Sequence, residues 1–358
     1  MTVRERILAG AYRGVRPALF RAYGGDPELI HEVTIRLLGR CPASVRALAG
    51  LLTATRTRET TLAGIRFPGR VGVAAGLDKD GRAVRAWSSL GFAFAELGTV
   101  TAKPQPGNDR PRLFRLRSSQ ALLNRMGFNN AGAATLALTL SRAGVYRGNL
   151  GAGIPIGVSI GKTKTTPLDE AVPDYLASLT AVAPHADYVA INVSSPNTPG
   201  LRELQDASAL DELARALVAH TGELARKWAT TPVPVFVKVA PDVSWPQLDA
   251  LLTACESAGV AGVIATNTTL ERDGLIGDDQ RLAGEAGGLS GRPLTVRARE
   301  VVSYIAGHTG LPIIGSGGVL TADDAKALFD RGASLVQLYT GFVYSGPALP
   351  LAIGRIGL

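Results

Sequence analysis

Short apolar runs alternate with longer amphipathic stretches from about residue 70 onward. Each run is almost continuously apolar, which is typical of parallel strands buried on both faces. The eight runs are 70–76, 92–98, 154–160, 186–193, 233–239, 259–267, 311–318 and 333–341. The stretches with helical periodicity between them are 80–90, 130–143, 168–182, 207–228, 245–257, 294–307 and 321–331. Eight strands alternating with helices predict an α/β fold, a closed (β/α)8 TIM barrel rather than an open sheet.

Residues 1–55 do not follow this repeat. In the segment 27–40, Ile30, Val33 and Leu37 recur at helical spacing, and apolar residues upstream do the same. We therefore expect an N-terminal helical segment over 1–55, followed by a catalytic barrel over 56–358. Two interpretations of its wide apolar faces stay open: a lid packed on the bottom of the barrel, or an interfacial element whose arginines face lipid headgroups. No apolar stretch reaches the roughly 18 residues of a spanning helix, so any membrane contact is expected to be peripheral.

Polar residues and glycines gather where the predicted strands end. They are Gly76, Gly98, Asn192, Lys238, Asn267, Gly317 and Tyr339. Barrel enzymes carry their chemistry on the loops at the carboxyl ends of the strands. The sequence therefore predicts an active site at this rim.

Composition narrows the class of partner. The formal charge of +8 suggests an anionic partner: nucleic acid, a phosphorylated cofactor or an acidic membrane surface. The basic residues form no tract with interleaved aromatics, so nucleic-acid binding is not expected. Cys41 and Cys255 lie far apart in the sequence, which argues against a disulfide framework, an iron–sulfur cluster or a cysteine-rich metal site. No metal is predicted.

Two glycine-rich segments look like nucleotide-binding loops but lack a required residue. A P-loop ending in GKT at 161–163 would need glycine at position 156, where Ile156 stands. The segment GSGGVL ends in Leu320, where a dinucleotide fingerprint has glycine. The glycines at 315–318 and the residues 339–341 nevertheless follow the last two predicted strands, a common place for backbone N–H groups to bind phosphate. They predict a phosphorylated ligand.

The densest polar chemistry is INVSSPNTPGLR at 191–202. Taken alone, it reads as an ordinary Ser/Asn/Pro turn. Lys79, the segment 124–128, Lys238 and the pair 267–268 lie at other strand ends of the same rim. Together these segments supply several amides and two cations around one cavity, which suits a planar, polar, anionic substrate.

A series of motifs resembles the dihydroorotate dehydrogenase family. The motifs are AAGLDKDG (74–81), ELGTVTAKPQPGNDRPRLFRL (96–116), NRMGFNN (124–130), NVSSPNTPGLR (192–202), TNTT (266–269), GGLSGRPL (287–294), GSGG (315–318) and LYTG (338–341). Soluble members typically have a cysteine base in the NxSCPN loop, whereas this chain has Ser195 there. The serine and the N-terminal extension resemble the quinone-dependent class 2.

The resemblance implies an FMN-dependent oxidation of dihydroorotate to orotate in de novo UMP synthesis, with a membrane quinone as electron acceptor. Ser195 would remove the C5 proton of dihydroorotate, helped by a relay involving Thr198 and the surroundings of Phe128, while C6 gives hydride to flavin N5. Lys238 would stabilise the negative charge that develops on the reduced flavin.

The resemblance also assigns binding residues. The residues expected to contact FMN are Ala74, Ala75, Gly76, Thr99, Asn124, Ser159, Asn192, Lys238, Thr266, Gly291, Gly317, Gly318, Tyr339 and Thr340. Those expected to contact the substrate are Lys79, Asn124, Arg125, Met126, Gly127, Phe128, Asn192, Asn197, Asn267 and Thr268. Those expected at the quinone are His31, Arg115 and Tyr339. Ser159 is a departure, because the family usually has asparagine at this position.

The expected protein is a monomer held peripherally on the cytoplasmic side of a bacterial cell membrane. Three other interpretations stay open. The first is another FMN barrel oxidoreductase, such as a dihydropyrimidine or dihydrouridine reductase. The second is a barrel enzyme that binds a phosphorylated ligand without flavin. The third is a basic membrane- or RNA-binding protein without catalysis.

Overall fold

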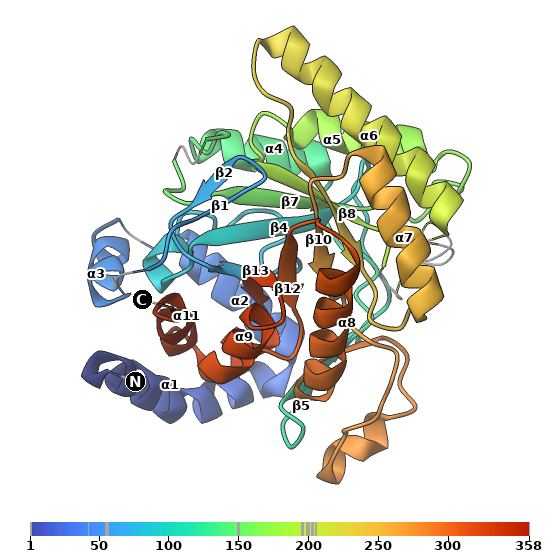
Figure 1. Cartoon of the computed structure of the whole chain (residues 1–358). Coiled ribbons are helices and arrows are strands. Elements are labelled where there is room, and N and C mark those ends of the chain that lie inside the picture. The colour runs from blue at the N-terminus through green and yellow to red at the C-terminus, as the bar shows by residue number, and fades with distance from the viewer. Residues whose placement is uncertain are drawn as a thin grey trace.

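Eight parallel strands form a closed barrel in the order β10–β12–β13–β3–β4–β7–β8–β9 (Figure 1). The computed structural model describes residues 2–41, 43–53, 57–148, 151–194, 197, 201, 204 and 206–357. The barrel strands are β3 (Val71–Val73), β4 (Phe94–Val100), β7 (Ile156–Ile160), β8 (Tyr188–Asn192), β9 (Val235–Val239), β10 (Gly262–Ala265), β12 (Ile313–Ser316) and β13 (Ala333–Leu338). Each predicted strand overlaps one of them, and only β4 extends past its predicted end, so the TIM-type barrel is confirmed.

Helices surround the barrel. They are α4 (Ala133–Arg142), α5 (Ala171–Val182), α6 (Ala207–Trp228), α7 (Trp245–Ala258), α8 (Thr295–His308), α9 (Ala322–Phe329), α10 (Thr340–Ser345) and α11 (Ala348–Gly354). Six of the seven helices predicted between the strands are confirmed.

The helix predicted over 80–90 is wrong. This segment forms successive turns and a short 3₁₀ helix, η2 (Ser88–Leu90). The buried Asp78 carboxylate accepts hydrogen bonds from the Ala83 backbone N–H and the Trp87 indole, both at 3.0 Å. Gly81 adopts a positive φ of 67°. The apolar residues of this segment do have helical spacing. The Asp78 carboxylate and the left-handed glycine nevertheless stabilise a series of turns in place of a helix.

Aromatic rings fill the lower part of the barrel interior. Phe94, Tyr188 and Phe236 are fully buried there. Each ring occupies the space opposite a glycine of the neighbouring strand: Gly72, Gly157 and Gly262, where an added Cβ would lie 2.1–2.5 Å from ring atoms. The hairpin of β1 (Thr60–Leu62) and β2 (Ile65–Phe67) adds two more side chains to this cluster. The amino-terminal end of the barrel is thus filled by side chains, as in other barrels of this type.

A second, antiparallel sheet stands outside the barrel, and the hydrophobic pattern did not predict it. It consists of β5 (Leu113–Leu116), β6 (Ala121–Asn124) and β11 (Gly288–Gly291), in the order β11–β6–β5. Its buried side chains form a small apolar cluster of their own, separate from the main core.

The N-terminal segment is helical, as predicted. It contains α1 (Val3–Arg21), the 3₁₀ turn η1 (Ala22–Gly25), α2 (Pro27–Gly39) and α3 (Ala43–Thr53). Helix α1 runs beside α11 and contacts α10 (Figure 1). Two of its polar side chains are bonded to α10: the Tyr12 hydroxyl donates to the Val343 carbonyl at 2.7 Å, and an Arg16 N–H donates to that of Tyr344 at 2.6 Å.

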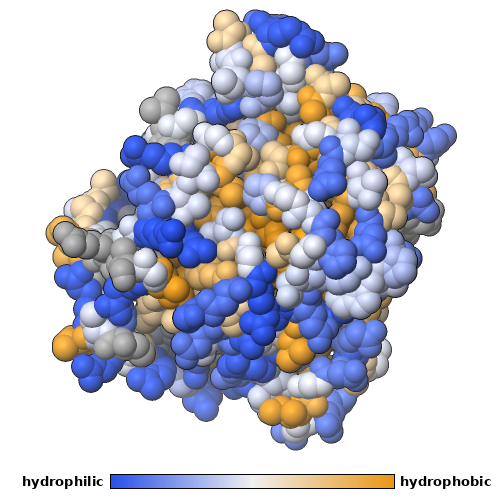
Figure 2. Space-filling model, in the orientation of Figure 1, coloured by the Kyte–Doolittle hydropathy of each residue, from blue (hydrophilic) through white to orange (hydrophobic). Residues whose placement is uncertain are grey.

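The interpretation of this segment as a lid on the barrel bottom is wrong. The β1–β2 hairpin fills that end, whereas α2 contacts β5, and His31 of α2 stacks on Tyr339, just after β13. Several large apolar side chains of the three helices are exposed: Val3, Ile7, Val15, Leu37, Val45, Leu48 and Leu51. On the face shown in Figure 2, the region of α1 is mainly hydrophilic. Among the described residues, no helix is both long and apolar enough to cross a membrane.

Candidate active site

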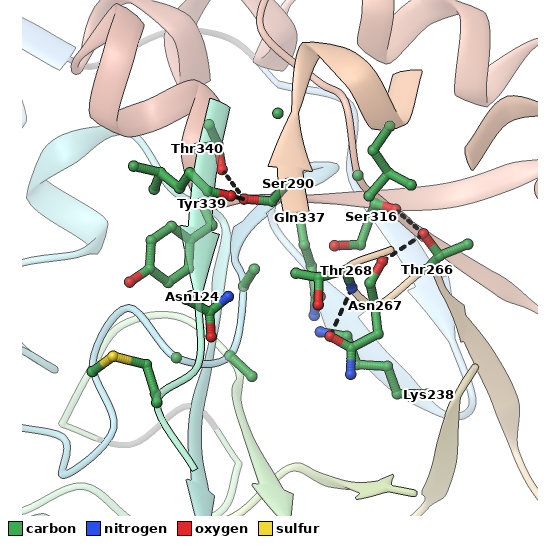
Figure 3. Close-up of a pocket in the computed structure, with 18 of the residues that line it drawn as sticks. Asn124, Lys238, Thr266, Asn267, Thr268, Ser290, Ser316, Gln337, Tyr339 and Thr340 are labelled. Atoms are coloured by element: carbon green, nitrogen blue, oxygen red, sulfur yellow. Dashed lines mark hydrogen bonds between the residues drawn. The ribbon is translucent and has the colours of Figure 1, made fainter. Parts of the chain in front are cut away.

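The main cavity lies at the carboxyl ends of the barrel strands, where the sequence placed the site. It encloses about 1100 Å³, including its open mouth. Its walls come from the strand ends, from the second sheet and from the loop after β10. Figure 3 shows Ser290 and Thr340 on one side, and Lys238 with Asn267 on the other.

Thirteen of the fourteen expected cofactor residues line this cavity. They are Ala74, Ala75, Gly76, Thr99, Asn124, Asn192, Lys238, Thr266, Gly291, Gly317, Gly318, Tyr339 and Thr340. The fourteenth, Ser159, is fully buried behind the lining, where its hydroxyl lies 2.9 Å from that of Thr99. Ser159 therefore supports Thr99 instead of reaching the cavity itself.

The part of the cavity near Gly318 suits a phosphate. Gly318 has a φ of +68°, and a Cβ on it would lie 2.3 Å from the Thr295 Cα, so only glycine fits. Thr340 begins α10, and the first N–H groups of a helix have no intrahelical partner. The hydroxyls of Ser290 and Thr340 are 2.7 Å apart beside them. Ser290 was missed by the sequence reasoning, although it lies within the GGLSGRPL motif.

Amide side chains line the opposite part of the cavity. The Asn192 amide donates to the Thr99 hydroxyl at 2.9 Å, and its oxygen accepts from the Asn267 amide at 3.3 Å. The Asn197 amide donates to the Asn124 oxygen at 3.2 Å. Thr268 lies at the cavity wall beside Asn267. Amides held by one another are preorganised to bind a polar planar ligand.

Three of the expected substrate or catalytic residues are not found at the cavity wall. Arg125 does not line the cavity; its guanidinium pairs with the Glu285 carboxylate. Ser195, the expected base, and Thr198, its expected relay partner, lie outside the residues that the structure describes. Met126, Gly127 and Phe128 line the cavity as expected.

Lys79 lies between the main cavity and a polar opening toward α2. Its ammonium donates to the Asn129 amide oxygen. Burial and, to a smaller extent, the nearby Arg112 lower the pKa of Lys79 to about 8, although Glu28 and Asp80 oppose the shift. A cation so placed suits an anionic substrate group.

Glu28 ties α2 to the loop that precedes β5. Its carboxylate accepts from Arg112 at 2.8 Å and from Arg110 at 3.1 Å, and both Glu28 and Arg112 are buried. Arg112 also donates to the backbone carbonyls of Pro106 and Asn108, each at 2.6 Å. Hydrogen bonds through Glu28 and Arg112 therefore connect the N-terminal helices to the loop on the amide side of the main cavity.

A second cavity of about 900 Å³ lies between α1, α2, α10 and the second sheet. Its walls are largely apolar, from residues such as Leu19, Phe20, Ile30 and Phe342. All three residues expected at the quinone, His31, Arg115 and Tyr339, line it. The His31 and Tyr339 rings stack with centroids 6.5 Å apart, and Tyr339 also lines the main cavity. Tyr339 thus forms a wall shared by the two cavities, together with Leu113 and Leu122.

Two polar groups give the apolar cavity its chemistry. Burial, with a smaller effect of Lys79, lowers the pKa of His31 to about 4, so the imidazole is neutral at neutral pH. The Nε of Arg115 is buried and has no hydrogen-bond partner among the described residues, while its guanidinium stacks on the Phe20 ring at 4.0 Å. A buried donor without a partner favours a ligand that brings an acceptor, such as a carbonyl.

Comparison with known proteins gives one consistent result. The sequence model of the dihydroorotate dehydrogenase family matches residues 57–355. A dihydroorotate dehydrogenase (quinone) from Chloroflexus aurantiacus is 55% identical over 349 residues, covering 96% of this chain and 94% of the relative. One from Salinispora arenicola is 56% identical over 348 residues, covering 94% of this chain and 96% of the relative. The crystal structure of DHODH from Eimeria tenella in complex with ferulenol superposes with a TM-score of 0.83 at 33% identity, covering 95% of this chain and 93% of that one.

Proposed function

Because the chain belongs to the quinone-dependent dihydroorotate dehydrogenase family, we propose that it oxidises dihydroorotate to orotate and passes the electrons through a bound FMN to a quinone. This reaction serves de novo pyrimidine synthesis. The observation that carries the proposal is the pair of adjacent cavities, one polar and phosphate-compatible and one apolar, which share Tyr339 as part of their common wall.

The main cavity fits FMN. Gly317, Gly318 and Thr340 would hold the phosphate, with Ser290 as an additional hydroxyl donor. Gln337 lines the cavity, and its buried side-chain oxygen has no hydrogen-bond partner among the described residues, so it would accept from a ring N–H. Bound FMN supplies a hydride acceptor, chemistry that no amino-acid side chain provides.

The amides around Asn192 would orient dihydroorotate, and Lys79 would face its negative charge. Ser195 would take the C5 proton, a task that a serine hydroxyl performs only when a neighbouring group or relay accepts the proton in turn. The apolar cavity would hold the quinone head beside His31 and Arg115, with a long tail along the apolar walls.

The N-terminal segment, taken as residues 1–55, would place the enzyme on the membrane. Its exposed apolar side chains, Ile7, Leu48 and Leu51 among them, would enter the lipid interface. We place the enzyme peripherally, as a monomer, on the cytoplasmic side of a bacterial membrane, with residues 56–358 as the catalytic barrel.

The cofactor is the first point to test. The purified protein is expected to be yellow, and heat should release FMN in about one equivalent per chain. Anaerobic dihydroorotate should then bleach the flavin absorbance of the native protein. The identity of the released flavin is checked by chromatography against FMN and FAD standards. Release of FAD, or a protein that stays colourless after incubation with FMN, would contradict the proposal.

A further inference from the structure

Four polar side chains meet inside the barrel, above its aromatic floor. Glu96 comes from β4, Tyr188 from β8, Lys238 from β9 and Gln337 from β13. None is more than 5% exposed. Lys238 and Gln337 also line the main cavity, whereas Glu96 lies behind them. The group thus connects a buried carboxylate to the cavity wall.

The two oxygens of Glu96 have different surroundings. Oε2 accepts from the Tyr188 hydroxyl at 3.0 Å and from the Gln337 amide at 2.6 Å. Oε1 is buried, has no hydrogen-bond partner among the described residues and lies 3.9 Å from the Lys238 Nζ. This distance is too long for a direct hydrogen bond, but it is within the range of an ion pair. Two donors therefore orient the carboxylate so that its other oxygen faces the ammonium group.

We propose that Glu96 is a positioning residue for the cofactor side of the reaction, whose carboxylate keeps Lys238 charged and directed at the main cavity. The inference rests on the proposed function, because the charge affects catalysis only if a group that becomes negative lies beside Lys238.

The need for a counter-ion follows from burial. An ammonium ion removed from water is strongly disfavoured unless an opposite charge is close. Burial lowers the pKa of Lys238, and Glu96 opposes this effect. Of the other groups around it, Gln337 is uncharged, and burial together with Glu96 raises the pKa of Tyr188 well above its ordinary value, so the phenol stays neutral. Lys79, the other cation at the cavity wall, has the same sign as Lys238. Within the described part of the chain, the compensating charge is that of Glu96.

Glu96→Gln removes the charge and keeps the shape. Without the carboxylate, the pKa of Lys238 should fall further, because burial then acts without an opposing charge. Selective ¹³C labelling of lysine side chains gives a direct readout, since the chain has only seven lysines. The ε-carbon resonance of Lys238, assigned by its loss in Lys238→Arg, is expected to titrate in Glu96→Gln and to stay constant in the native protein.

The flavin gives a second readout that is not activity. In Glu96→Gln, the equilibrium ratio of reduced to oxidised flavin should depend on whether Lys238 is protonated. This ratio should be about tenfold lower above the pH at which Lys238 loses its proton than below that pH. This difference corresponds to a drop of roughly 30 mV in the two-electron potential. The extra pH dependence should vanish in Glu96→Gln/Lys238→Met, because no titrating lysine is left.

Tyr188→Phe is the matched control. It removes a donor to the same carboxylate but leaves both charges, so the Lys238 resonance should not titrate. If Glu96→Gln fails to fold, Glu96→Asp keeps the charge at a longer distance and should lower the pKa of Lys238 by a smaller amount. A Lys238 resonance that stays constant in the folded Glu96 variant overturns the inference, even when flavin binds and dihydroorotate reduces it. A protein that binds no flavin overturns the proposed function, while the lysine resonance still decides the role of Glu96.

Discussion

Replacing Ser195 with alanine is expected to slow the reduction of the bound flavin by dihydroorotate about 10²–10⁴-fold, the usual contribution of a positioned base. The variant should still bind FMN and orotate, because the glycine and amide residues that line the main cavity are unchanged. Anaerobic stopped-flow absorbance measures the rate, and orotate titration of the flavin spectrum measures binding.

Ser195→Cys is the matched control for this prediction. A thiol is somewhat larger than a hydroxyl and is a much stronger acid, so it forms its anion far more readily. The cysteine variant should therefore reduce the flavin faster than the alanine variant, most clearly at alkaline pH. An alanine variant that reduces its flavin at the native rate would remove Ser195 from the mechanism.

Filling the apolar cavity should separate the two half-reactions. Thr34 lies on α2 and lines this cavity. Thr34→Trp is expected to lower the rate of flavin reoxidation by a long-tailed quinone about 10- to 100-fold. A bound quinone would have to share the cavity with the new indole ring. Overpacking of this kind costs roughly 1–3 kcal/mol, and 1.4 kcal/mol corresponds to a tenfold change in affinity. Flavin reduction by dihydroorotate should be unchanged, because the main cavity is untouched.

Leu37→Trp is the control on the same helix, since Leu37 is 65% exposed and does not line the cavity. It should leave quinone reduction unchanged. These point variants are cleaner than deletion of residues 1–55, because that deletion would strip Arg112 and Arg355 of their buried partners Glu28 and Glu5. Equal quinone kinetics in Thr34→Trp and the native enzyme would show that the quinone binds elsewhere.

The barrel could be predicted because its signal is local and repeated. Each of the eight strands is a nearly continuous apolar run bounded by polar residues, and this pattern does not depend on distant contacts. The antiparallel sheet could not be found in this way, because its strands are short and pair β6 with β11, more than 160 residues later in the chain. The helix prediction for 80–90 was wrong for a related reason. The hydrogen bonds of Asp78 determine the backbone conformation of this segment, and hydrophobic periodicity does not reveal them.

The lining of the main cavity was predicted mainly through motifs, since strand ends converge at one rim whatever their separation in sequence. Glu96 was missed as a functional residue. The sequence did contain an indication of its role, since Glu96 is a carboxylate within the apolar strand 92–98. Such a group is stable in a barrel interior only when it has partners. Those partners, Tyr188 and Lys238, lie on other strands, so the sequence could flag the anomaly but not identify the contacts. The outward orientation of Arg125 depends on Glu285, also distant in sequence.

The short helix α10 is a wall of both cavities. Its first residue, Thr340, lines the main cavity, while Phe342 and Val343 line the apolar one, and α1 is hydrogen-bonded to its last turn. A ligand that orders this helix from one side reduces the entropy cost of ordering it for a ligand on the other side. The two binding events then become cooperative without any change of shape. Such coupling is reciprocal. Binding of a ligand in the main cavity would therefore tighten the binding of a ligand in the apolar cavity, and an occupied apolar cavity would slow dissociation from the main one.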